Sequence, residues 1–191
     1  MPDDAFTKRG RSLEDDYFRK KDRELIEKIR VAAAADQARK DLGRQAGLDD
    51  PELVQELLDL GFTPDTVGLL PLVPIIQMAW AEGGITKAER ELILRLARSR
   101  GIEAGSTADG QLTAWLTEQP SEAVFTRARR LIRAMLDSGS AQSDALNAGD
   151  LVKYCEDIAS ASGGILGIGR ISAEERALLS SIAADLNARR S

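Results

Sequence analysis

The sequence predicts an all-α protein, in which a long N-terminal helix precedes a helical bundle built from two pseudo-symmetric helix-turn-helix repeats. Apolar residues recur at helical spacing along most of the chain, and no stretch alternates as a strand would. A third observation is that one pattern occurs twice in the same register, which indicates an internal repeat. The matching positions are Ile85, Thr86, Glu89, Arg90, Leu92, Ile93, Leu96 and Ala97 in the first copy and Ile171, Ser172, Glu175, Arg176, Leu178, Leu179, Ile182 and Ala183 in the second.

The first expected element is one long helix from Ser12 to about Gly43, after a polar start. Ser12 can cap it, acids crowd its first turn, and Gly43 can close it. Its main apolar residues form a stripe too thin to fill a core, so the helix either extends into solvent or binds in a partner's groove. These residues are Phe18, Leu25, Ile26 and Ile29.

Charge divides the chain in the same way. Residues 1–45 hold 12 Lys/Arg and 10 Asp/Glu, a net charge of +2, whereas residues 46–191 hold 14 and 21, a net charge of −7. We therefore expect two parts, an N-terminal arm with the long helix (1–45) and a helical domain (46–191).

Prolines and glycines mark the helices that follow. Pro51 and Gly61 bound a short helix, and Pro64 begins the next one, which is apolar almost all round. Pro71 and Pro74 must kink that helix or confine the regular part to residues after Pro71. We expect it to lie at the centre of the bundle.

The remaining boundaries come from the same signals. We expect a helix over 87–100, a loop over 102–110, helices over 111–119 and 121–137, a connector over 138–147, and then the second repeat. In each repeat a Gly-Gly pair, Gly83-Gly84 or Gly163-Gly164, ends an apolar helix. Thr86-x-x-Glu89 and Ser172-x-x-Glu175 then form capping boxes that open the next helix.

Composition excludes several classes of function. The chain has one cysteine, Cys155, and no histidine, so an internal disulfide, a Cys/His zinc site and a histidine-based catalytic triad all lack their residues. We expect no enzymatic activity and no cofactor. The longest charge-free run, residues 66–81, is too short to span a membrane, and no basic patch indicates nucleic-acid binding. The N-terminus lacks a signal-peptide pattern, which predicts a cytoplasmic protein.

The repeats carry a family resemblance. LLPLVPIIQMAWAEGGITKAERELILRLA and ASASGGILGIGRISAEERALLSSIAADL resemble the two halves of a TerB-like domain, the helical module named for tellurite resistance, over about residues 48–188. This resemblance implies a stress-response module. It also implies divalent-cation binding through acids at the turns, which here would be Glu82, Glu89 and Glu175. The alternative is that Glu89 and Glu175 act only as capping-box acids, which their spacing already explains.

A second resemblance lies in the arm. AFTKRGRSLEDDYFRKKDRELIEKIR, at about residues 4–30, is similar to the inhibitory helix of the mitochondrial ATPase inhibitor protein. It implies a non-enzymatic regulator whose helix folds into a cleft of the catalytic head of ATP synthase and blocks hydrolysis. The residues that would bind this partner are Phe6, Lys8, Arg9, Glu14, Asp15, Tyr17, Phe18, Arg19 and Leu25. The alternatives are a charged helix that packs on the bundle and one that pairs with a second copy of the chain.

Overall fold

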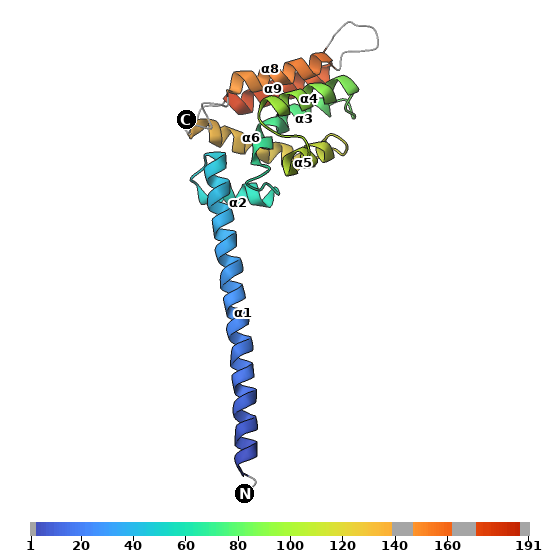
Figure 1. Cartoon of the computed structure of the whole chain (residues 1–191). Helices are drawn as coiled ribbons and strands as arrows, with labels where there is room; N and C mark the ends of the chain where they lie inside the picture. The colour runs from blue at the N-terminus through green and yellow to red at the C-terminus, as the bar shows by residue number, and fades with distance from the viewer. Residues whose placement is uncertain (1–2, 139–146, 162–170, 188–191) are drawn as a thin grey trace. The chain divides into compact units, whose positions relative to one another are not determined.

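The computed structural model describes residues 3–138, 147–161 and 171–187, and within the first helix it describes the side chains of Tyr17 and of Arg19 onward. All regular structure in these residues is helical, as predicted. The elements are α1 (Asp3–Ala46), α2 (Pro51–Asp59), the 3₁₀ helix η1 (Val67–Leu72), α3 (Val73–Ala79), α4 (Lys87–Ser99), α5 (Thr107–Trp115), α6 (Glu122–Asp137), α8 (Ala148–Ala161) and α9 (Ala173–Asn187) (Figure 1). The chain forms two compact units, unit 1 (Met1–Lys40) and unit 2 (Asp41–Ser191).

Helix α1 is longer than the sequence predicted at both ends. It begins at Asp3 rather than at Ser12, because residues 3–11 contain no proline and an isolated glycine lowers helix stability by only about 1 kcal/mol. At its other end the helix continues through Gly43. A Cβ atom on Gly43 would lie 2.8 Å from the carbonyl oxygen of Leu48, so this glycine permits close packing instead of ending the helix.

The residue that ends α1 is Gly47, whose φ of 66° lies in the left-handed region that favours glycine. The Leu48 amide donates to the carbonyl of Gly43 at 2.9 Å, and the Gly47 amide donates to that of Arg44 at 3.3 Å. This pair of bonds is a Schellman motif, and Leu48 is buried after it. The last turns of α1 thereby join the core of unit 2, in which Leu42 and Ala46 are fully buried.

The core of unit 2 is organised around α3, as expected from its composition. Every residue of α3 is buried, and the helix contacts α4, α6, α8, α9 and η1. The prolines act as predicted, since Pro71 lies inside the 3₁₀ helix and Pro74 falls in the first turn of α3. The α-helical part is therefore confined to the residues after Leu72.

Most other boundaries are confirmed, with two corrections. The helix predicted to begin at Pro64 begins at Val67, because residues 63–66 form a turn in which the Thr66 amide donates to the carbonyl of Thr63 at 3.0 Å. Helix α5 begins at Thr107, inside the predicted loop over 102–110, and it ends before the predicted limit of 119. The Ser106 hydroxyl accepts from the Asp109 amide at 3.1 Å, so Ser106 is an N-cap that the sequence analysis overlooked. The helix then packs through Leu112, which is fully buried.

The two helix pairs of the sequence repeat, α3 with α4 and α8 with α9, lie together in unit 2. Helix α8 contacts α3, α4 and α9, and Figure 1 shows α8 and α9 side by side. Leu151, Cys155, Ile158 and Ala159 form the buried face of α8. The predicted glycine pair Gly163-Gly164 lies outside the described residues.

Candidate functional site

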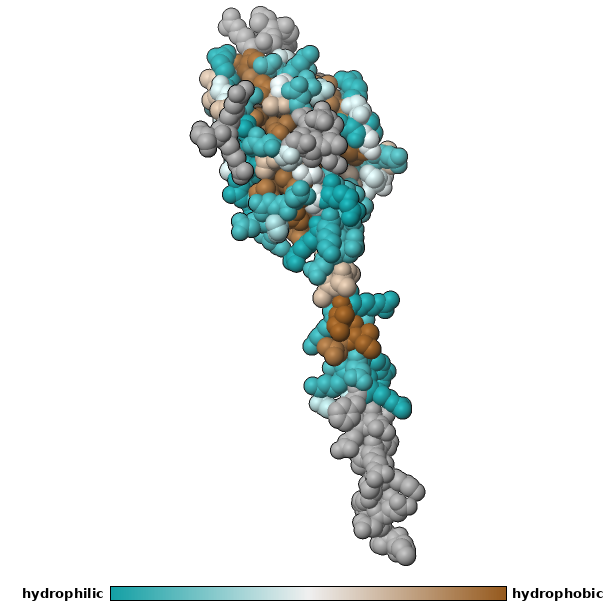
Figure 2. All heavy atoms as spheres, turned by 90° about the vertical axis from the view of Figure 1, so that its left-hand side faces the viewer, coloured by the Kyte–Doolittle hydropathy of each residue, from teal (hydrophilic) through white to brown (hydrophobic). Residues whose placement is uncertain are grey.

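The candidate site in unit 1 is an apolar stripe on α1, formed by Leu25, Ile26 and Ile29. Their exposed fractions are 57%, 61% and 60%, and Figure 2 shows apolar atoms gathered on the surface of this helix. Leu25 and Ile29 are four residues apart, so their side chains are neighbours on one face, with Ile26 beside them. Tyr17 and Val31 are also exposed, but their positions fall on other sides of the helix.

Every side chain from Arg19 to Gln37 is exposed, including the charged residues that flank the apolar stripe. Such a helix gains its stability from local propensity and from pairs of neighbouring charges, because it buries little surface of its own. Alanine has a higher intrinsic helix propensity than leucine or isoleucine, so helix propensity does not explain these three large aliphatic side chains. They therefore form an apolar surface that the described residues of the chain leave uncovered.

Three of the residues predicted to bind a partner have described side chains. Tyr17, Arg19 and Leu25 are exposed, and the Lys21 ammonium lies 5.6 Å from the centroid of the Tyr17 ring. The other six belong to α1 by their backbone, and their side chains lie outside the described set. These are Phe6, Lys8, Arg9, Glu14, Asp15 and Phe18.

In unit 2 the predicted capping boxes are confirmed. The Thr86 amide donates to Glu89 Oε2 at 2.6 Å, while the Glu89 amide donates to the Thr86 hydroxyl at 3.3 Å. The second copy repeats this geometry, with 2.7 Å from the Ser172 amide to Glu175 Oε2 and 3.1 Å from the Glu175 amide to the Ser172 hydroxyl. Each glutamate is only 2% exposed, so both acids are built into helix starts.

Burial raises the pKa of Glu89. Hydrogen bonds from Thr86 oppose this effect, and the nearby charges of Glu175 and Glu82 add to it. The acids predicted to bind a cation therefore influence one another electrostatically. Within the described parts of the chain, however, no three acidic, histidine or cysteine side chains are close enough together to hold a metal ion.

Cys155 is buried in α8, where burial raises the pKa of its thiol to about 12 and the nearby Glu156 adds to the shift. A thiol with this pKa is protonated at neutral pH and is a poor nucleophile. Cys155 therefore serves as an apolar core residue.

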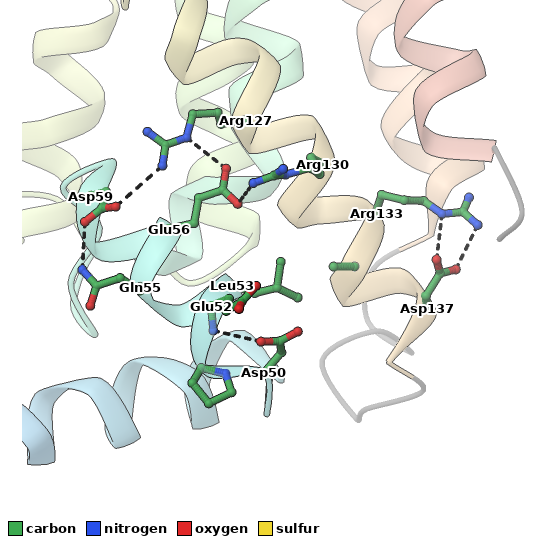
Figure 3. Close-up of a pocket in the computed structure, with 12 residues that line it drawn as sticks. Asp50, Glu52, Leu53, Gln55, Glu56, Asp59, Arg127, Arg130, Arg133 and Asp137 are labelled. Carbon is green, nitrogen blue, oxygen red and sulfur yellow. Dashed lines mark hydrogen bonds and ion pairs between the residues drawn. The ribbon is translucent and has the colours of Figure 1, made fainter.

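An ion-pair network between α2 and α6 was missed by the sequence analysis. Glu56 is 5% exposed and accepts from Arg127 Nε at 2.9 Å and from Arg130, while Arg127 also pairs with Asp59 (Figure 3). Burial raises the pKa of Glu56, but hydrogen bonds from Arg130 and Arg127, together with their charges, outweigh burial, so the pKa is lowered. A usable signal was present, because α2 carries an acid on its otherwise apolar face and α6 carries arginines three residues apart.

The hollow beside this network has a volume of about 780 Å³. Its arginines are already paired with carboxylates, since Arg133 also binds Asp137 at 3.0 Å (Figure 3). Acidic residues outnumber basic ones along its lining, which disfavours an anionic ligand. We interpret the network as a structural one, whose ion pairs hold α2 and α6 together.

No protein-family profile, curated protein or solved structure matches this chain. Across the described residues, no helix has both the length and the apolar character needed to cross a membrane.

Proposed function

We propose that this protein is a non-enzymatic regulator that binds a partner protein through its N-terminal helix. The observation that supports the proposal is the exposed apolar stripe of Leu25, Ile26 and Ile29 on α1. Between residues 19 and 40, the other side chains of this helix are charged, polar or alanine, apart from Val31. Burial of a large aliphatic side chain contributes roughly 1.5–3 kcal/mol, so three of them in one groove would anchor a helix.

The partner that the resemblance favours is an ATPase, most specifically the catalytic head of ATP synthase. Position 18 lies seven residues before Leu25 and therefore on the same face of α1, so the segment that is similar to the ATPase inhibitor protein and the apolar stripe belong to one continuous binding face. The charged residues around this face suit the charge-assisted contacts expected at the rim of such a cleft.

The test measures ATP hydrolysis by the isolated catalytic head in the presence of the full chain and of a chain lacking residues 1–30. The full chain is expected to slow hydrolysis, and the deletion is expected to abolish the effect. In a double variant, Leu25→Glu with Ile29→Glu, inhibition should weaken by at least about tenfold, because charges would replace the anchors. Val31→Glu is the matched control, since Val31 is equally exposed but lies off the stripe.

The absence of inhibition at micromolar protein would remove ATP synthase as the partner. Equal loss of inhibition in Val31→Glu would show that helix charge, and not the stripe, controls binding. Self-pairing through α1 is a further alternative, and light scattering by the full chain and by a chain lacking residues 1–45 separates it from partner binding.

We propose that unit 2 is a TerB-like body, which supports a second candidate function as a metal-responsive stress module. The favouring observations are the matched capping boxes of α4 and α9 and the electrostatic influence of Glu175 and Glu82 on Glu89. Calorimetric titration with Ca²⁺ tests this candidate. Heat that disappears in a Glu89→Gln, Glu175→Gln double variant would support it, and a flat trace for the unmodified chain would reject it.

A further inference from the structure

A small apolar pocket lies between α4 and α8, with α3 at its base. Its volume is about 280 Å³, just below the range of roughly 300–1,000 Å³ typical of pockets for drug-sized ligands. The walls include the fully buried Ile75 and Ile93 together with Ile158, which is buried to 1% exposure. These branched side chains give the pocket an aliphatic interior that suits a small aliphatic group.

The rim of the pocket carries two opposite charges on facing helices. Arg95 comes from α4 and Asp157 from α8, and both side chains are exposed. Neither makes a hydrogen bond or ion pair with any residue in the described part of the chain. The rim therefore offers one cation and one anion that none of the described residues pairs with.

Arg95 differs in this respect from the other arginines near it. Arg90 donates to the carbonyl of Leu116, and Arg98 donates to the carbonyl of Ile102 at 2.8 Å. The Arg100 guanidinium lies 5.9 Å from the centroid of the Tyr154 ring, another wall of the pocket, and so helps to hold that ring in place. Arg95 makes no comparable contact with the described residues, so its guanidinium is available at the rim.

We propose that this pocket binds a free α-amino acid with an aliphatic side chain, such as leucine. The carboxylate of such a ligand pairs with Arg95, its ammonium pairs with Asp157, and its side chain enters the aliphatic interior. A fatty acid pairs with Arg95 alone, and its carboxylate is repelled by Asp157. An alkylamine pairs with Asp157 alone, and its ammonium is repelled by Arg95. Only a ligand with both charges beside one aliphatic group satisfies the whole rim.

The experiment is calorimetric titration of the full chain with L-leucine, N-acetyl-L-leucine, L-leucinamide and octanoate. Leucine is expected to bind at least about tenfold more tightly than the other three, because each of them lacks one charged group that the rim would pair. Tighter binding of octanoate would overturn the proposal, as would the absence of heat with millimolar leucine.

Two variants locate the site. Asp157→Asn is expected to weaken the binding of leucine at least about tenfold without weakening that of N-acetyl-L-leucine, because that compound has no ammonium to pair with Asp157. Arg95→Gln should weaken the binding of leucine similarly without weakening that of leucinamide, which has no carboxylate to pair with Arg95. The matched controls are Glu156→Gln and Lys153→Gln, exposed positions of α8 that do not line the pocket. Unchanged leucine affinity in Asp157→Asn, with its folding verified by circular dichroism, would overturn the assignment.

Discussion

The two units use the same secondary structure in opposite ways. In unit 1, Leu25, Ile26 and Ile29 lie on a helix whose described side chains are almost all exposed. In unit 2, the apolar residues of α3 and of the buried faces of α6 and α8 form one core. The comparison shows that helical periodicity alone does not tell where an apolar face is buried. The width of that face is more informative, because a narrow stripe on a charged helix leaves little to bury within the chain.

The largest expected effect comes from truncating a core residue and comparing it with a stripe residue. Phe125 of α6 is 1% exposed, so Phe125→Ala should destabilise unit 2 by about 3–5 kcal/mol. Ile29→Ala should leave its stability within about 0.5 kcal/mol, because Ile29 is exposed. Urea unfolding followed by the fluorescence of Trp80 and Trp115, both in unit 2, measures the two effects. A large loss from Ile29→Ala would mean that the stripe belongs to the core.

The α2–α6 network provides the next largest effect. Glu56→Gln should destabilise unit 2 by about 1–2 kcal/mol at pH 7, since Arg130 and Arg127 are exposed enough to be hydrated once the carboxylate is gone. The lowered pKa of Glu56 adds a pH dependence. The ionised Glu56 stabilises unit 2 above pH 4.5, the ordinary pKa of a glutamate. This stabilisation is lost as the pH falls through the lowered pKa of Glu56 in the folded state. Urea midpoints of the two proteins should therefore converge in acid, and a constant difference would contradict the role of the charge.

Removal of helix caps gives a smaller effect that also separates the units. Thr86→Ala and Ser172→Ala should each cost about 1 kcal/mol, because each hydroxyl accepts from a first-turn amide. Ser12→Ala should have no such cost, because position 12 lies inside α1 and alanine is the better helix former. Thermal unfolding of unit 2 checks the first two variants, and the helical signal of an isolated peptide over residues 1–40 checks the third. A loss of helical signal in Ser12→Ala would show that Ser12 is an N-cap, as the sequence predicted.

The smallest expected effect concerns Glu89. Its raised pKa means that the folded state holds the proton more tightly than the unfolded state. Tighter proton binding by Glu89 therefore stabilises the folded protein in acid. This stabilisation is lost as the pH rises from about 4.5 through the pKa of Glu89 in the folded state. Glu89→Gln keeps an acceptor for the Thr86 amide and removes the charge. The variant should match the unmodified protein in acid and equal or exceed its stability at pH 7. A lower stability at pH 7 would show that the carboxylate charge is needed at the cap.

The sequence predicted the local features well because local chemistry controls them. Proline before a helix, glycine after one, and a hydroxyl three residues before a glutamate each satisfy backbone groups whatever the rest of the chain does. The error at Ser12 has the same origin. A serine is a cap only where the preceding residues leave the helix, and nothing in residues 3–11 forces them to leave it.

Features that depend on contacts between distant residues could not be predicted from the sequence. Glu56 and the arginines of α6 are more than seventy positions apart, and Arg95 and Asp157 come from helices separated by α5 and α6. Position along one helix shows which face a side chain occupies but not what lies opposite to it. The buried acid of α2 and the regular spacing of arginines in α6 were visible individually, but their pairing was not.

The sequence by itself determined the helical class, most helix boundaries, both capping boxes and the absence of histidine chemistry, since each of these follows from residue type and short spacing. Only the tertiary structure decided that Gly43 is a packing residue, that ion pairs join α2 to α6, and that Arg95 and Asp157 line an aliphatic pocket between α4 and α8. The physical reason is that packing and electrostatic pairing depend on distances through space, which the order of residues does not contain.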